Sequence, residues 1–227
     1  MNSPQAIFAE NLSKTYKLPG AAPLTVLSGV SIAVAPGEHV AVLGRSGTGK
    51  STLLNLLGGL DSPDPGTNAK IEIYGRDIVK ASEKQRAEIR AKEIGFVFQS
   101  FHLLPELTIE ENVRLPSRAL PRNLRKDADG RSLELLRAAG LGERLGHRPN
   151  ELSGDEQQRV AVVRALMNAP RLILADEPTG NLDQATGDAI LDLLFDLSGR
   201  FSDTPPALAI VTHSKEIAAR CDRVVKL

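Results

Sequence analysis

The sequence contains a single cysteine, Cys221, and no tryptophan. One cysteine excludes a disulfide within the chain and suits a reducing compartment. No apolar run reaches the roughly 18 residues that a membrane helix needs. The N-terminal stretch MNSPQAIFAENL also lacks the basic segment and apolar run of a signal peptide. We therefore expect a chain that is soluble by itself, with another chain supplying any membrane-spanning segments.

An excess of charge of either sign is also missing, because 28 basic residues balance 28 acidic ones. This balance gives no support to a nucleic-acid partner, although it leaves a local basic patch open. The 227 residues suit one sizeable α/β domain or a core with a small subdomain. The function must therefore be sought in motifs rather than in composition.

Short apolar runs alternate with helical patterns along the whole chain. This alternation predicts an α/β fold with a mostly parallel sheet that is covered by helices. The apolar runs predict strands over residues 7–12, 30–34, 39–44, 70–74, 94–99, 171–176, 207–212 and 223–227. The helical patterns lie near residues 50–59, 83–92, 131–139, 156–168, 185–198 and 215–220.

Two regions depart from this alternation. The stretch up to residue 43 is rich in strand patterns and predicts a separate antiparallel β layer. The region 100–155 contains Pro105, Pro116, Pro121 and Pro149 and helix-forming segments, without a convincing strand. We therefore predict a single domain over 1–227, in which 1–98 and 156–227 form the core and about 99–155 form an inserted helical subdomain.

The segment GRSGTGKS, residues 44–51, matches the phosphate-loop pattern G-x-x-x-x-G-K-[ST] in full. It follows the apolar run HVAVL and precedes the helical pattern STLLNLLGGL, as the motif requires. Glycines let backbone N–H groups surround phosphate oxygens, and the helix N-terminus adds positive charge. The predicted nucleotide-binding residues here are Gly44, Arg45, Ser46, Gly47, Thr48, Gly49, Lys50, Ser51 and Thr52.

Two residues of this loop have predicted roles of their own. Lys50 would reach the β- and γ-phosphates, and the Ser51 hydroxyl would bind Mg²⁺. The alternative is a glycine-rich turn with a chance lysine. The strand before the motif and the helix after it favour nucleotide binding on a P-loop NTPase core of the RecA-like type.

The segment RLILADEP, residues 171–178, predicts a buried strand that ends in two carboxylates. Asp176 is placed to hold Mg²⁺, as the acid of this strand does in P-loop NTPases. Glu177 follows at the carboxyl edge of the sheet, where it could orient and deprotonate an attacking water. A solvated acidic turn is the alternative, which the neighbouring phosphate loop disfavours.

The segment ELSGDEQQRVAVVRALMNAP, residues 151–170, predicts a helix that begins at Ser153. Ser153 and Glu156 form S-x-x-E, the pattern of a capping box. The start of a helix can also bind an anion, but the acid Asp155 would repel one. The capping box explains Ser153 and Glu156 and gives no reason for Gly154.

Taken together, these motifs resemble those of the ATP-binding subunits of ABC transporters. LSGDEQQRVAVVRAL is similar to the signature motif of that family, and it precedes RLILADEP in the family's order. The resemblance makes Gln99 in FVFQ the Q-loop glutamine and His213 in AIVTHS the switch histidine. It also makes Asp183 in NLD the D-loop aspartate and Tyr16 in KTYKLPG the aromatic residue that stacks on adenine.

Longer sequence segments resemble those of one group within the family. LLNLLGGLD, IGFVFQSFHLLPELTIEENVRLP and ADEPTGNLD are similar to the macrolide-exporter and lipoprotein-releasing group. ATGDAILDLLF and IAARCDRVVKL resemble the YbbA-type ATPases within it. Such subunits pair with a permease that carries a large extracytoplasmic domain, at the cytoplasmic face of the bacterial inner membrane.

The resemblance implies an ATPase that binds ATP and Mg²⁺ and closes into a homodimer. Ser153, Gly154 and Asp155, with Asp183, would face the ATP that the second subunit holds. Gln99 would touch Mg²⁺ and the attacking water, and His213 would bond to the γ-phosphate. Asp155 stands where the family usually has glycine, so we expect it to disfavour the closed dimer.

Simpler interpretations and other classes remain at this point. Tyr16 could be an ordinary aromatic, Gln99 could merely end a strand, and His213 could cap a helix. A non-transport ABC ATPase that acts on DNA or ribosomes is the second class, although DNA-acting members have long coiled-coil inserts. A small P-loop kinase is the third, but it would not need LSGDEQQR.

Overall fold

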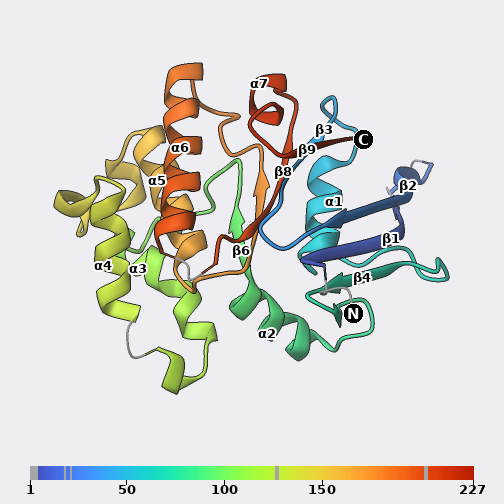
Figure 1. Cartoon of the computed structure of the whole chain (residues 1–227), viewed down its shortest axis with the longest axis horizontal. Coiled ribbons are helices and arrows are strands. Elements are labelled where there is room, and N and C mark those ends of the chain that lie inside the picture. Colours follow the sequence, from blue (N-terminus) through green and yellow to red (C-terminus); the bar gives the residue numbers. More distant parts are fainter. Residues whose placement is uncertain (1–4, 18, 21, 126–127, 202–203) are drawn as a thin grey trace. The chain divides into compact units, whose positions relative to one another are not determined.

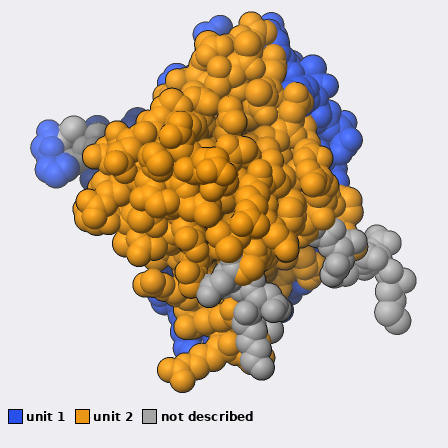
Figure 2. Space-filling model, turned by 90° about the vertical axis from the view of Figure 1, so that its left-hand side faces the viewer, with its two compact units in different colours: residues 1–90, 207–227 blue, residues 91–206 orange. Residues whose placement is uncertain are grey.

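The computed structural model describes the chain except residues 1–4, 18, 21, 126–127 and 202–203. It divides into two compact units, Met1–Arg90 with Ala207–Leu227, and Ala91–Pro206. Figure 2 shows the two units in blue and orange. Helix α2 (Glu83–Glu93) runs across the boundary between the two sequence ranges.

The first unit contains the predicted antiparallel layer. Strands β1 (Ile7–Tyr16) and β2 (Leu24–Val34) pair from Ile7 with Val34 to Tyr16 with Leu24, and β4 (Lys70–Ile73) joins the other side of β1. A two-residue strand, β5 (Arg76–Asp77), pairs with β4. The sheet order is β2-β1-β4-β5, so the expected antiparallel layer is present. Its expected extent, the stretch up to residue 43, is wrong, because residues 39–43 pair with parallel strands and the layer also includes β4 and β5.

The same unit contains three parallel strands. Strand β3 (His39–Leu43) lies between β8 (Ala207–Thr212) and β9 (Arg223–Lys226). Its central residues are fully buried, and β8 is buried along its whole length, as expected for a parallel sheet whose faces are covered. Helix α1 (Lys50–Leu57) packs on β8 and β1 through buried leucines, and α7 (Lys215–Ala218) contacts β3 and β8 (Figure 1).

The second unit is built around helix α5 (Gly154–Leu166). Helices α3 (Ile109–Arg114), α4 (Ala128–Ala138) and α6 (Gln184–Arg200) contact α5, and so does strand β6 (Ile94–Val97) (Figure 1). Strand β7 (Leu172–Asp176) pairs with β6 in parallel, with Ile94 opposite Leu172 and Val97 opposite Ala175. Short 3-10 helices cover Leu115–Ala119, Arg122–Leu124, Gly142–Arg144 and Pro149–Glu151.

Buried polar side chains stabilise the irregular parts of this unit. Asn112 is fully buried, accepts a hydrogen bond from Leu104 N and donates to Leu104 O, Leu107 O and Thr108 O. These bonds satisfy backbone groups that a turn cannot pair by itself. The segment after Gln99 is thereby tied to helix α3.

The α/β class with parallel and antiparallel sheets agrees with the sequence prediction, and each predicted strand and helix has a counterpart. Helix α3 was missed because six residues are too short to show helical periodicity. Its capping box, Thr108 with Glu111, was the available signal. Strand β5 was missed because it has only two residues. The predicted helical subdomain, about 99–155, lies within the sequence range of the second unit.

Candidate functional site

The phosphate loop connects the end of β3 to the start of α1. Gly44 N donates to Thr212 O at 3.2 Å, so the loop begins beside the end of the neighbouring strand β8. Gly49 has φ 90° and precedes the helix, and a Cβ there would lie 2.8 Å from the Val26 carbonyl oxygen. Only glycine combines this left-handed backbone with so close an approach. The glycine is therefore required by the local geometry.

Lys50 closes the loop on itself. Its side chain is 7% exposed, and Nζ donates to the carbonyl oxygens of Gly44 and Arg45, both at 3.0 Å. The first turn of α1 contains no acidic residue to oppose an anion. An ammonium group and the N-terminus of a helix thus meet at one place, as an anion site requires. Ser51 is exposed at this helix start, and Thr52 is half-buried.

His213 follows strand β8 and lines a pocket of about 410 Å³ together with residues of the phosphate loop. The pocket also contains three cationic side chains, which favour an anionic ligand. Its lining residues are Leu43, Gly44, Arg45, Thr48, His213, Lys215, Lys226 and Leu227. The structure therefore brings His213 to the loop. Lys215 and Lys226 were missed, because lysines near strand and helix ends have no distinctive pattern.

Tyr16 ends strand β1 in the same unit. Its hydroxyl donates to Asp61 Oδ2 at 3.0 Å, and Lys14 Nζ lies 5.2 Å from the ring centroid. Lys14 also donates to Asp61 Oδ1 at 2.6 Å. Asp61 therefore fixes the phenol group of Tyr16 in place.

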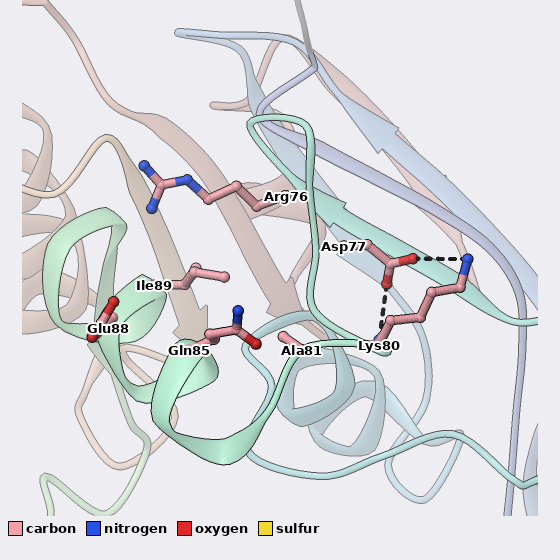
Figure 3. A pocket seen from close by; sticks show the side chains of 7 residues that line it. All are labelled: Arg76, Asp77, Lys80, Ala81, Gln85, Glu88 and Ile89. Atoms are coloured by element: carbon pink, nitrogen blue, oxygen red, sulfur yellow. Dashed lines mark hydrogen bonds and ion pairs between the residues drawn. The ribbon is translucent and has the colours of Figure 1, made fainter.

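A second pocket of the first unit lies between β5 and α2 (Figure 3). It is lined by Arg76, Asp77, Lys80, Ala81, Gln85, Glu88 and Ile89. Asp77 accepts hydrogen bonds from the backbone of Val79 and Lys80 and pairs with the Lys80 ammonium at 3.5 Å. Two cations and two anions give this pocket no net charge that would select a nucleotide.

In the second unit, the ends of β6 and β7 bring together Glu177 and Gln99. Glu177 is 9% exposed and has φ 42°, a left-handed conformation that is strained for a residue with a Cβ. The Gly180 N–H donates to Glu177 O at 2.9 Å and closes the turn. Asn181 Nδ2 donates to Gln99 O at 2.9 Å. Asp176 is the last residue of β7, next to Glu177.

A Cβ on Gly180 would lie 3.0 Å from the Gln99 amide nitrogen and 3.3 Å from Glu177 Cβ. The glutamine, the glutamate and the D-loop segment thus occupy one small region. The parallel pairing of β6 and β7 explains this, because parallel strands end at the same edge of a sheet.

Ser153 is the N-cap of α5, and the predicted capping box with Glu156 is confirmed. The Ser153 hydroxyl donates to Asp155 Oδ1, and Arg159 Nη2 donates to Asp155 Oδ2 at 3.0 Å. The hydrogen bond from Ser153, together with the charge of Arg159, holds the pKa of the Asp155 carboxyl below its usual range. Asp155 therefore has two partners within its own helix, and one of them is the hydroxyl of Ser153.

Asp183 is the N-cap of α6 and accepts from Thr186 N at 3.1 Å and Thr186 Oγ1 at 2.6 Å. These hydrogen bonds from Thr186 lower the pKa of its carboxyl. The side chain of Asp183 thus has a structural role in addition to the predicted one.

Arg164 was not identified from the sequence. Its guanidinium donates to the carbonyl oxygens of Phe101 and His102, which have φ 60° and 50°. Burial lowers the pKa of this guanidinium to about 10. The available signal was an arginine within the apolar run AVVRAL, where a charged group needs internal partners.

Known sequences are similar to this chain over nearly its full length. The sequence profile described as "ABC transporter" matches residues 27–180. The lipoprotein-releasing system ATP-binding protein LolD of Legionella pneumophila (strain Paris) is 46% identical over 219 residues, which cover 96% of this chain and 93% of that protein. The uncharacterized ABC transporter ATP-binding protein YbbA of Escherichia coli (strain K12) is 45% identical over 224 residues, covering 96% and 95%.

Two solved structures of the ATP-binding cassette MJ0796 are also similar. A dimeric post-hydrolysis state bound to ADP and Pi has a TM-score of 0.83 at 39% identity. Another dimeric structure, described as a bacterial ABC transporter cassette, has a TM-score of 0.82 at 41% identity. Each comparison covers 97% of this chain and 94% of the other. The resemblance to the lipoprotein-releasing and YbbA-type proteins is thereby confirmed.

The charge of Asp155 should stabilise the folded chain in a pH-dependent way. Its lowered pKa means that the stabilisation is full above the unfolded pKa of about 3.9 and is lost as the pH falls through the lower folded value. Asp155→Asn should therefore lower the free energy of unfolding by about 0.3–1 kcal/mol at pH 7 and by less below about pH 4. Urea unfolding at several pH values measures this difference.

Asp196→Asn is the matched control, because Asp196 also pairs with an arginine four residues later, Arg200, but lies near a helix C-terminus. Removing its charge should not cost the stability that the dipole gives at a helix start. An Asp155→Asn effect that stays constant down to pH 2 would contradict the assignment.

Proposed function

Because this chain belongs to the ABC transporter family, we propose that it is the ATP-hydrolysing motor of a separate membrane permease. The observation that carries the proposal is the closed phosphate loop, in which buried Lys50 contacts two loop carbonyl groups at the start of α1. This arrangement provides positive charge where the phosphates of ATP would bind.

The oxygen donors of the proposed site fit Mg²⁺. Ser51 offers a hydroxyl, Gln99 an amide oxygen and Asp176 a carboxylate, and Mg²⁺ prefers such ligands. A bound Mg²⁺ ion would neutralise charge on the phosphate oxygens. Lys50 would add its own charge there, and the remaining loop residues, 44–52, would donate backbone hydrogen bonds.

Glu177 is the proposed general base, which would accept a proton from the attacking water. Its strained backbone and its burial support this role, because strain of this kind persists where the surrounding structure enforces it. His213 would donate to the γ-phosphate, and its position in the pocket beside Arg45 supports this. Tyr16 would stack on the adenine ring, with its hydroxyl held by Asp61.

ATP is proposed to close two copies of the chain into a dimer. Ser153, Gly154, Asp155 and Asp183 would then face the nucleotide of the partner subunit. The dimeric cassettes, which are 39% and 41% identical to this chain, support this assembly. Residues 1–98 and 156–227 would form the catalytic core, and about 99–155 the helical subdomain that receives the permease.

The proposed partner is an integral membrane permease with a large extracytoplasmic domain, at the cytoplasmic face of the bacterial inner membrane. The relative called a lipoprotein-releasing system ATP-binding protein supports this choice. In the part of the chain that the structure describes, every helix is too short or too polar to cross a lipid bilayer. The membrane-spanning part of such a transporter would therefore come from the permease.

Glu177→Gln should keep ATP binding and lose turnover, because the change is nearly isosteric and removes the base. We expect a loss of at least about 100-fold in kcat, the lower range for general-base catalysis, with a dimer that persists in ATP and Mg²⁺. Steady-state hydrolysis and gel filtration measure the two effects. Glu134→Gln, an exposed position on α4, is the control and should have no effect. Unchanged turnover in Glu177→Gln would refute the proposed role.

The permease should raise the ATPase rate of the chain. Two copies that are held on one permease meet at a high effective concentration, whereas free copies must meet by diffusion. We therefore expect the isolated chain to be mostly monomeric and slow, and the complex to be severalfold faster per active site. Hydrolysis rates with and without permease in detergent test this. A fully active, stable dimer without permease would contradict it.

Replacing Asp155 by glycine should favour dimer closure and hydrolysis. A carboxylate about 5 Å from one phosphate charge costs roughly 3 kcal/mol at an effective dielectric constant near 20. Arg159 at 3.0 Å offsets part of this repulsion. If about 1 kcal/mol remains, Asp155→Gly should increase the ATPase rate with permease about fivefold.

Asp155→Asn serves as the comparison for the glycine variant. It removes the charge but keeps the side chain, so it separates repulsion from the close backbone approach that glycine allows. A glycine variant that is no faster than the native chain would show that the acid is tolerated in the closed dimer.

A further inference from the structure

Gln158 on helix α5 makes a single described hydrogen bond from a buried position. The residue is 1% exposed, and its amide nitrogen donates to the carbonyl oxygen of Pro178 at 2.6 Å. Among the residues that the structure describes, its buried Oε1 atom has no hydrogen-bond partner. The other fully buried residues of this helix, such as Val160 to Val163, are all apolar, so Gln158 is its one buried polar residue among those that the structure describes.

Stability alone does not explain a glutamine at this position. An amide that is buried with its oxygen unpaired loses its hydration without full compensation. An apolar side chain of similar length would avoid this cost, and it would leave only the Pro178 carbonyl group unpaired. The two effects oppose each other, so burial by itself gives no reason for a glutamine rather than an apolar residue here. The hydrogen bond from Gln158 is therefore of interest for the backbone segment that it holds in place.

The bond fixes the backbone next to the proposed general base. The peptide bond between Glu177 and Pro178 is planar, and the proline ring locks the φ angle of Pro178. An anchored Pro178 carbonyl group therefore restricts the orientation of the Glu177 backbone. Glu177 itself has φ 42°, a conformation that needs support from its surroundings. The Gly180 N–H supports it from one side, and Gln158 holds the following residue.

We propose that Gln158 is a positioning residue, which holds Glu177 in its strained conformation through the Pro178 carbonyl group. This inference rests on the proposed function, in which Glu177 is the general base. Gln158 also lies four residues after Gly154, about one helical turn into α5. A displacement of the helix start by the nucleotide of the partner subunit would therefore move Gln158 and change the orientation of Glu177.

Gln158→Met tests the proposal, because methionine keeps the length of the side chain and removes the donor. We expect kcat to fall about tenfold or more, since small displacements of catalytic groups have such effects. The Kd for ATP and the KM should stay within about twofold of the native values, because Gln158 has no proposed contact with nucleotide. Thermal unfolding, equilibrium ATP binding and steady-state hydrolysis give these quantities. If the methionine variant does not fold, Gln158→Asn keeps the amide but shortens its reach, and the same loss is expected.

Asn168→Leu is the matched control. Asn168 also has a side-chain oxygen without a partner among the described residues, and its amide donates to the carbonyl groups of Ala91 and Pro116. Neither acceptor residue adjoins Glu177 or Pro178 in the chain. We expect this variant to lower the melting temperature and leave kcat unchanged.

A double-mutant cycle with Glu177→Gln distinguishes positioning from a general structural effect. If Gln158 acts through Glu177, Gln158→Met should cause no further loss of the residual rate in the Glu177→Gln background. Additive losses, or a native kcat in Gln158→Met, would overturn the inference while leaving the proposed function intact. Native turnover in Glu177→Gln alone would instead refute the proposed function.

Discussion

The hydrogen bonds of the Lys50 ammonium to the carbonyl groups of Gly44 and Arg45 define the phosphate loop. The backbone turns tightly at Gly49, and this turn is possible because glycine tolerates φ 90° and has no Cβ that would clash with Val26 and Leu27 of β2. The loop also needs a rigid strand before it and a helix after it. Buried β3 and the leucines of α1 provide both. The packed core of the first unit thus fixes the long, flexible side chain of Lys50 at the phosphate loop.

The second unit has a different requirement, because it must hold residues in strained backbone conformations. Glu177, Phe101 and His102 all have positive φ angles, which cost free energy in residues with a Cβ. Side chains of α5 donate hydrogen bonds to these segments: Gln158 contacts Pro178, which follows Glu177, and Arg164 contacts the carbonyl groups of Phe101 and His102 themselves. One helix therefore supports both strained segments, and its apolar face packs against the rest of the unit. Its polar side chains Gln158 and Arg164 hold the backbone at the strained residues.

Sequence predicted most of the fold because buried strands such as β3 and β8 are continuous apolar runs between helical patterns. The phosphate loop and the acids after β7 were also predictable, since their chemistry needs fixed residue types at fixed spacing. The contacts of Gln158 and Arg164 were not predictable, because each joins a helix to a segment that is distant in sequence. No local sequence pattern indicates which distant segment such a side chain will contact. The first half of β2, residues 24–29, was also missed, because Ser28 and Gly29 separate its apolar residues from the run that was recognised as a strand.

The start of α5 shows how one set of groups can serve two states. Within the single chain, the Ser153 hydroxyl donates to Asp155, and Arg159 balances the charge of that acid. A hydroxyl has one proton, so Ser153 cannot keep this bond and also donate to a phosphate oxygen. Binding a second nucleotide at this helix start would therefore have to break an existing hydrogen bond as well as oppose a carboxylate. A glycine in place of Asp155 would remove the carboxylate and its hydrogen bond, but the Ser153 hydroxyl would still have Glu156 Oε2 at 3.0 Å as an acceptor. The glycine would also remove a favourable charge from the first turn of the helix. In the proposed dimer, the acid would thus stabilise the separate chain at the expense of the closed pair, and the balance between the two would depend on how strongly Arg159 holds Asp155.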